Sequence, residues 1–267
     1  MRLSSPDPLA GPRRPSRCVR QLQPHLLGLL LLTLTSCGGE APPPRVELGE
    51  APPPRVELGD LDALQAHGQL RILIPQVSGV DGLPRQVDLF DLERDLADSL
   101  SRVLGLEPVF VVVEERSALI EKLVAGHGDL IAANLTVTSE RAERIAFSQP
   151  LTRVREQVVS RNDGPSIRRV KDLEGRSVVV RRSSSFWETV HALAADHPGI
   201  ELVEAPENMD TEEILYRVST GEYDVTVADD RLVSDALGYM PGLMVGFSLT
   251  EERPIAWGVR PGAPMLL

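Results

Sequence analysis

Short apolar runs alternate, from about residue 60 onward, with segments in which apolar residues recur every three or four positions. The run Leu70–Ile74 is apolar at almost every position, which is typical of a strand covered on both faces of a sheet. The segment Phe90–Leu104 carries its apolar residues on one helical stripe and ends at Gly105. Strands that alternate with helices in this way predict a parallel α/β sheet.

The same alternation continues to residue 259 but starts afresh after Pro150, which predicts two α/β units. The further strands are expected at Val109–Val113, Leu130–Ala133, Arg155–Arg161, Ser177–Arg181, Ile200–Val203, Tyr223–Ala228, Leu243–Phe247 and Ile255–Val259. The further helices are expected between Asp60 and Gly68 and over Ala118–Ala125, Phe186–Ala195, Thr211–Thr220 and Leu232–Leu237.

The stretch that follows the strand ending at Ala133 is the richest in candidate chemistry. It forms a hydroxyl-rich turn with Thr136, and a short helix opens near Thr138 or Ser139. The N-terminus of a helix attracts anions through its free N–H groups and its dipole. Arg141 lies in the first helical turn, where a cation needs a negative partner, and a ligand carboxylate held by Arg141 and the backbone of Thr136 would supply one. The residues alone equally allow Thr138 to be an ordinary cap and Arg141 a solvated surface charge.

Two later junctions between strand and helix also carry polar side chains. The serines Ser183, Ser184 and Ser185 form either a second anion-binding helix start or a plain cap. Asp229 and Asp230 end a strand and begin a helix, so that one of them, or both, can cap that helix.

The first 36 residues have the pattern of a targeting segment rather than of a folded element. Arg13, Arg14, Arg17 and Arg20 precede the apolar run Leu26–Leu34, which is too short and too well terminated to span a membrane. The ending Leu34-Thr35-Ser36-Cys37 resembles a bacterial lipobox, in which the cysteine is acylated and becomes the new first residue. The alternatives are an uncleaved anchor and an ordinary secretory signal.

A tandem repeat follows Cys37. The nine residues Ala41–Gly49 recur as Ala51–Gly59, and each copy contains three consecutive prolines. Triple prolines favour extended polyproline II at ~3.1 Å per residue, so residues 37–59 are predicted to be a semi-rigid tether between the lipid and the folded part. A duplication without function is the alternative.

Charge and cysteine content exclude several classes of function. Cleavage before Cys37 removes five arginines and one aspartate, which lowers the formal net charge from −11 to −15. A chain this acidic is not expected to bind nucleic acid. The only other cysteine, Cys18, leaves with the signal, so the mature chain has no disulfide. The chain has no nucleophile elbow, no zinc-protease motif and no Cys/His cluster, so we predict no catalytic residue, metal or cofactor.

The stretch Ala132–Pro150 resembles the signature of family-3 periplasmic solute-binding proteins, which reads roughly small-small-x-x-(S/T)-x-T-x-x-R, four or five residues, and F-S-x-P. The resemblance implies an α/β, two-lobed clamshell (type II) with two hinge crossings, near Thr152 and Pro254. It implies lobe 1 over 60–153 with 254–267 returning to it, and lobe 2 over 154–253.

The same resemblance implies a set of ligand-binding residues. The arginine that matches Arg141 grips the ligand's α-carboxylate, and the hydroxyl residues that match Thr136 and Thr138 belong to the same step of the signature. The second lobe contacts the carboxylate through the positions of Ser184 and Ser185. The aspartate that matches Asp229 binds the ligand's α-amino group, and the two lobes would close over an amino acid or a peptide end.

The pocket also departs from the family pattern. Where the family carries aromatic residues after its first strand, this chain has Gln76-Val77-Ser78. Trp187 is the candidate for ligand stacking, with a place in the core as its alternative. Arg182 either pairs with a nearby acid or favours a ligand with extra negative charge.

Segments near the two ends resemble one branch more closely, the N-terminal half of membrane-bound lytic murein transglycosylase F. These segments are Leu61–Leu64, Gly68–Ile72 and Arg253–Arg260, together with the lipobox. Because the chain stops at Leu267, before the lysozyme-like domain and the usual closing helix, we expect a C-terminally truncated sequence.

Two functions follow as hypotheses. One is a lipid-anchored solute receptor for an ABC transporter permease; the other is a sensor of muropeptides for a peptidoglycan-cleaving enzyme. Both imply the periplasmic side of a bacterial membrane, with the outer membrane as the expected site.

Overall fold

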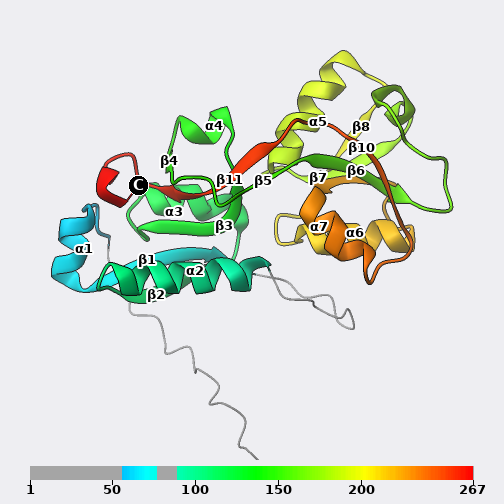
Figure 1. Cartoon of the computed structure of the whole chain (residues 1–267). Helices are drawn as coiled ribbons and strands as arrows, with labels where there is room; N and C mark the ends of the chain where they lie inside the picture. The colour runs from blue at the N-terminus through cyan, green and yellow to red at the C-terminus, as the bar shows by residue number, and fades with distance from the viewer. Residues whose placement is uncertain (1–55, 77–88, 267) are drawn as a thin grey trace, which may run out of the picture. The chain divides into compact units, whose positions relative to one another are not determined.

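The computed structural model describes residues 56–76 and 89–266, which form two β-sheets with helices packed on them (Figure 1). The predicted signal segment, the predicted lipidation site Cys37, most of the repeat and the positions of Val77 and Ser78 lie outside the described residues. No helix in the described part of the chain is long and apolar enough to cross a membrane.

The first sheet has the strand order β2-β1-β3-β11-β4, and β5 pairs with β11. The strand bounds are β1 Gln69–Pro75, β2 Glu107–Val113, β3 Leu130–Thr136, β4 Ala146–Phe147, β5 Thr152–Val154 and β11 Arg253–Val259. The strand β1 runs parallel to both β2 and β3, whereas β11 is antiparallel to β3, β4 and β5. Figure 1 shows β11, in red, lying beside β3 and β5 although it is far from them in sequence.

Both faces of the first sheet are covered, as the continuous apolar runs predict. On one face, Ile72 and Leu130 pack against α2 (Leu89–Val103), which contributes Ala97. On the other face, Leu73 and Ile131 pack against α3, and the apolar residues of this cluster are fully or almost fully buried. The helices of this lobe are α1 Leu61–His67, α2, α3 Leu119–Val124 and α4 Ser139–Ala142, with short 3-10 turns η1 Arg116–Ala118 and η3 Pro264–Leu266.

The second sheet has the strand order β10-β6-β9-β7-β8. The bounds are β6 Glu156–Arg161, β7 Ser177–Arg181, β8 Glu201–Ala205, β9 Val225–Asp229 and β10 Leu243–Ser248, with the 3-10 turn η2 at Val170–Leu173. The helix α5 (Ser185–Asp196) packs Phe186 and Val190 against one face of this sheet. The helices α6 (Thr211–Thr220) and α7 (Asp230–Leu237) cover the other face.

The predicted parallel pairing holds for part of each sheet, and both sheets are mixed because antiparallel strands join them. Parallel pairs need a crossover connection, and the chain has one, usually a helix, between β1 and β2, between β2 and β3, and between β7 and β8. The strands β6 and β11 enter their sheets by direct passage between the lobes, and β10 follows α7 and a short loop; all three pair antiparallel. The short strands β4 and β5 were also missed, since two or three residues carry too little periodicity to predict a strand.

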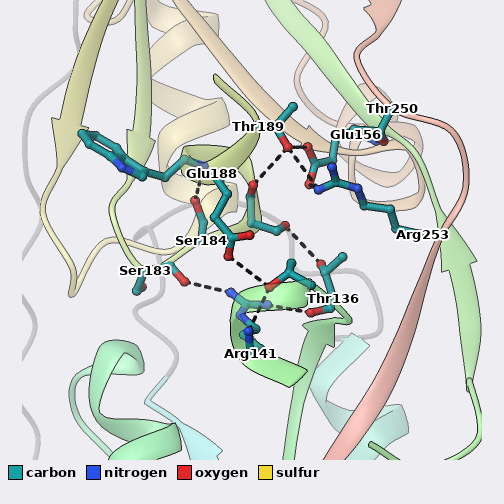
Figure 2. A network of polar contacts seen from close by, with 12 residues as sticks. Thr136, Arg141, Glu156, Ser183, Ser184, Glu188, Thr189, Thr250 and Arg253 are labelled. Atoms are coloured by element: carbon teal, nitrogen blue, oxygen red, sulfur yellow. Dashed lines mark hydrogen bonds and ion pairs between the residues drawn. The ribbon is translucent and has the colours of Figure 1, made fainter. Parts of the chain in front are cut away.

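A buried polar cluster lies where the chain passes between the sheets. The strand β5 ends at Val154 and β6 begins at Glu156, while β11 brings the chain back at Arg253. The Glu156 carboxylate is inaccessible to solvent and accepts a 3.0 Å hydrogen bond from Arg253 Nη1. Thr189 Oγ1, on α5, donates to the same carboxylate. The two passages are therefore tied to each other and to α5 (Figure 2).

Candidate functional site

A cavity of about 140 Å³ lies between the carboxyl ends of strands from the two sheets. Its walls include Pro75, Gln76, Glu114, Arg116, Asn134, Thr136, Arg141, Thr152, Val154, Arg181, Ser184, Ser185, Phe186, Glu207, Asn208, Met209, Asp210, Thr211, Glu212, Asp229, Arg231, Leu232, Asp235, Tyr239 and Ile255. Ligands of open α/β sheets bind at this edge, where helix starts and strand ends face the crevice.

Arg141 is a buried cation at the centre of this cavity. Only 9% of the residue is exposed, and burial lowers the pKa of its guanidinium. Its Nη1 donates to the backbone carbonyl of Thr136 at 2.9 Å, and its Nη2 donates to the carbonyl of Ser183 at 2.8 Å (Figure 2). Because Arg141 is buried, the alternative interpretation of it as a solvated surface charge is wrong. No carboxylate of the described residues forms an ion pair with Arg141.

The hydroxyl residues before Arg141 have different surroundings. Thr136 is the last residue of β3 rather than part of a turn, and its Oγ1 accepts a 3.2 Å hydrogen bond from Ser185 of α5. Thr138 is the N-cap of α4, and its Oγ1 accepts from Arg141 N at 3.3 Å and donates to Glu188 at 3.2 Å. Thr138 is buried and is not among the residues that line the cavity. Its predicted contact with a ligand therefore has no direct geometric support.

The start of α5 supplies the opposite wall. Ser184 is the N-cap, accepts from Trp187 N at 3.2 Å and donates to the carbonyl of Arg181 at 2.6 Å. Ser184 and Ser185 are both buried and both line the cavity. Ser184 therefore both caps α5 and lines the cavity, because the N-terminus of α5 is directed at the cavity.

Asp229 lies at the end of β9 and lines the cavity with a carboxylate that makes no hydrogen bond. It occupies the N-cap position of α7, but its side chain does not cap the helix. Its Oδ1 is buried without a partner, and burial, followed by the neighbouring Glu156 and Asp230, raises its pKa to about 7. Asp230 is the first residue of α7 and likewise has a buried Oδ1 without a partner. Neither aspartate is a side-chain cap, so the capping alternative is wrong for both.

Three charged residues of the site were not predicted from the sequence. Arg116 and Arg181 line the cavity, and burial lowers the pKa of Arg116 to about 9, with a further contribution from the nearby Arg181 and Arg141. Glu93, on α2, is buried and accepts a 2.7 Å hydrogen bond from Asn134 N, and burial raises its pKa to about 7. The only sequence signal was an arginine at the end of an otherwise apolar strand, Ser177–Arg181.

Of the remaining pocket candidates, Trp187 and Arg182 are not among the residues that line the cavity, whereas Gln76 is. Trp187 packs with the core of the second lobe and stacks on His191, as the alternative reading of Trp187 predicts. Arg182 lies 3.8 Å from a Glu204 oxygen and over the Trp187 ring, so it pairs with an acid rather than facing a ligand. Gln76 lines the cavity where the family carries an aromatic residue. Among the described residues, no group of three or more His, Cys, Asp or Glu could hold a metal ion.

The model of the bacterial extracellular solute-binding proteins, family 3, matches residues 90–234. Membrane-bound lytic murein transglycosylase F of Maricaulis maris is 33% identical over 232 residues, which are 86% of this chain and 49% of that protein. The protein of the same name from Desulfosudis oleivorans is 31% identical over 199 residues, 74% of this chain and 43% of its own length. The chain spans about half the length of the curated relatives it matches.

Solved structures share the fold at lower sequence identity. An ancestral arginine-binding protein bound to arginine has a TM-score of 0.64 and 24% identity, with 75% of this chain and 88% of that chain covered. An ancestral amino acid-binding protein, a precursor of cyclohexadienyl dehydratase, has a TM-score of 0.63 and 21% identity, with 77% and 88% covered. These likenesses confirm the predicted two-lobed, type II periplasmic binding fold.

Proposed function

Because the chain belongs to the bacterial extracellular solute-binding proteins of family 3, we propose that it is a non-enzymatic module that closes over a small amino-acid-like ligand or a peptide end. The observation that carries this proposal is the pairing of Arg141 and Asp229 in one cavity. Among the described residues, the buried Arg141 guanidinium forms no ion pair, and the partly buried Asp229 carboxylate has a buried Oδ1 without a hydrogen-bond partner, so the two complement the two ends of a zwitterion.

Each group has a defined task in this proposal. Arg141 binds the ligand's α-carboxylate, assisted by Thr136 and by the helix start at Ser184 and Ser185. Asp229 binds the α-amino group from the second lobe. Because the ligand contacts both lobes, it favours the closed arrangement by its differential affinity for it, and the two passages near Glu156 and Arg253 act as the hinge.

Isothermal titration calorimetry of the purified chain against a panel of amino acids and muropeptides tests the proposal. We expect Arg141→Ala and Asp229→Ala each to weaken binding on the order of 100-fold, because each leaves a buried ligand charge without its partner. Arg144→Ala is the matched control, since Arg144 is exposed and follows Arg141 by three residues. The proposal fails if no member of the panel binds, or if both cavity variants bind as the wild type does.

The second candidate function is the sensor half of a peptidoglycan-cleaving enzyme. It is supported by the names of the relatives, which are murein transglycosylases about twice as long as this chain. Under this proposal the ligand is a muropeptide, whereas a transporter receptor would prefer a free amino acid. The calorimetric panel separates the two, and reading the genomic sequence beyond Leu267 adds an independent test: an in-frame lysozyme-like domain favours the sensor.

We further propose that the chain is an extracytoplasmic lipoprotein, anchored through Cys37 and held off the membrane by residues 37–59. The Leu-Thr-Ser-Cys sequence supports it. Metabolic labelling with palmitate in a bacterial host tests it: label is expected on the wild-type chain and not on Cys37→Ser, while Cys18→Ser should be labelled as the wild type is. Fractionation of the labelled cells between inner and outer membrane then tests the expected outer-membrane location.

A further inference from the structure

Arg181 is a second buried cation of the cavity, and its charge has no partner of opposite sign in contact with it. It is the last residue of β7 and is 6% exposed. Its guanidinium makes one hydrogen bond among the described residues, from Nη2 to Thr211 Oγ1 at 3.1 Å. Its Nε is buried and has no hydrogen-bond partner. A guanidinium offers five N–H donors, so most of the donors of Arg181 have no hydrogen-bond partner among the described residues.

The acids nearest to Arg181 are engaged elsewhere. The Glu207 carboxylate accepts from Ser183 N at 2.9 Å and from Ser183 Oγ at 2.5 Å. The Asp210 carboxylate caps α6 by accepting from Glu213 N at 2.7 Å. Both acids stabilise the charge of Arg181 from a distance, yet neither forms an ion pair with it. The cavity therefore holds the guanidinium in place without neutralising it through direct contact.

The charged side chains that line the cavity indicate which charges a bound ligand should carry. Arg141 and Arg181 are buried guanidiniums that form no ion pair among the described residues, and the charge of Arg141 lowers the pKa of Arg181. Asp229 is a lining carboxylate, partly buried, whose Oδ1 is buried without a hydrogen-bond partner. The other acidic side chains of the wall are engaged or exposed: Glu212 accepts from the Tyr239 hydroxyl, and Glu114 and Asp235 are exposed. Arg116 also lines the wall, and its guanidinium donates to the Ala133 carbonyl. Among the described residues, the two cations without an ion pair, Arg141 and Arg181, and the one carboxylate without a hydrogen bond, Asp229, complement a ligand with two negative groups and one positive group.

We propose that the ligand carries a second carboxylate, bound by Arg181, in addition to the α-carboxylate bound by Arg141. This inference rests on the proposed function, because it takes the pairing of Arg141 and Asp229 with the ligand's backbone as given. The ligand class is an acidic amino acid, or a peptide end with a free side-chain carboxylate. The planar fork of a guanidinium matches a carboxylate with two hydrogen bonds, and a cavity of about 140 Å³ suits a short acidic side chain.

Calorimetry with glutamate, glutamine and arginine, each in the L and D forms, tests the charge preference. Glutamate and glutamine differ by little except one negative charge, so their ratio isolates the contribution of the second carboxylate. We expect the wild-type chain to bind one form of glutamate at least 10-fold more tightly than the matching glutamine. Arg181→Gln should remove this preference by weakening glutamate about 100-fold while leaving glutamine within about threefold. Arg182→Gln is the matched control, because Arg182 is the next residue, loses the same charge, and has a side chain that is 66% exposed.

The outcomes distinguish this inference from the proposed function. If glutamine binds as tightly as glutamate, if arginine binds more tightly than either, or if Arg181→Gln keeps the wild-type ratio, the second-carboxylate site is wrong while amino-acid binding stands. If none of these amino acids binds, the second-carboxylate site is overturned, while the wider panel of amino acids and muropeptides decides the proposed function. The ratio of the glutamate and glutamine affinities is measured on the wild-type chain, so it tests the second-carboxylate site even if Arg181→Gln does not fold.

Discussion

Arg141 Nη2 donates a 2.8 Å hydrogen bond to the carbonyl oxygen of Ser183, so a side chain of the first lobe holds the turn before α5 in the second. Two further hydrogen bonds join the lobes nearby, from Ser185 Oγ to Thr136 Oγ1 and from Thr138 Oγ1 to Glu188. All three involve residues at or beside the predicted ligand grip. If these residues bind the ligand as proposed, ligand binding and lobe closure use the same side chains, and the two events depend energetically on each other.

The geometry of Arg141 predicts that its charge alone is insufficient for binding. Arg141→Lys keeps the cation but loses the forked donors that reach the carbonyls of Thr136 and Ser183. We expect the variant to bind the ligand about 10-fold to 100-fold more weakly in calorimetry, and Arg144→Lys to bind as the wild type does. Wild-type affinity in Arg141→Lys would show that the fork is not used.

The buried carboxyl of Asp229 predicts a ligand affinity that rises with pH through about 7. The ligand's amino group requires the ionised carboxylate, whereas burial together with Glu156 and Asp230 raises the pKa of Asp229 to about 7 against the opposing effect of Arg116 and Arg141. Below this pKa the affinity should fall by up to about tenfold per pH unit, with proton release on binding. Calorimetry in buffers of different ionisation enthalpy measures that release, and Asp229→Asn should abolish it.

The same pKa predicts the opposite trend for the stability of the ligand-free chain. A carboxyl whose folded-state pKa is raised binds its proton more tightly in the folded than in the unfolded state. Its contribution to stability is therefore fully present below about pH 4 and is lost as the pH rises through about 7. Thermal melts of the wild type and Asp229→Asn between pH 4 and 8 should diverge as the pH rises, with the variant losing less. Parallel curves would contradict the assignment of this carboxyl.

Thr138 is expected to act on stability and Thr136 on binding. Thr138→Val removes the cap of α4 and the hydrogen bond to Glu188, which should cost about 1 kcal/mol of unfolding free energy and change affinity by no more than a few fold. Thr138→Ser should restore the stability. Thr136→Val, whose side chain lines the cavity, should weaken binding more than Thr138→Val does. If Thr138→Val weakened binding more than Thr136→Val in calorimetry, Thr138 would be part of the ligand site.

The buried carboxylate of Asp129 is predicted to contribute strongly to the free energy of unfolding through its contacts in the first sheet. It is fully buried and accepts hydrogen bonds from Arg71 Nη2 at 2.8 Å and from Arg260 Nη2 at 3.2 Å, which connects β1, β3 and the end of β11. Asp129→Asn removes the carboxylate charge that the guanidiniums of Arg71 and Arg260 both contact, and it should cost about 3 kcal/mol in urea unfolding. Asp98→Asn, which removes the exposed pair with Arg102 on α2, should cost less than about 1 kcal/mol. Similar losses in both variants would contradict this role.

Local pattern predicted most of the elements because burial on both faces leaves a continuous apolar run, as in β1 and β3, and one-sided burial leaves a stripe, as in α2. The resemblance carried by Ala132–Pro150 also led to the correct family. The sequence by itself thus determined the fold class, the family and the junctions that face the ligand crevice, since each depends on residues close together in the chain.

Only the tertiary structure decided which side chains meet. Arg181 is a single charge at the end of an apolar strand, and nothing in its neighbours along the chain tells whether it faces solvent or the cavity. Its burial, and its proximity to Arg141, about 40 residues earlier, result from the packing of two lobes. Likewise, the failure of Asp229 to cap α7 depends on its side-chain direction, which the fold sets. Electrostatic pairing acts through space between residues that are distant in the sequence. The charges that line the cavity, and the ligand charges that complement them, therefore follow from the tertiary structure and not from the sequence pattern.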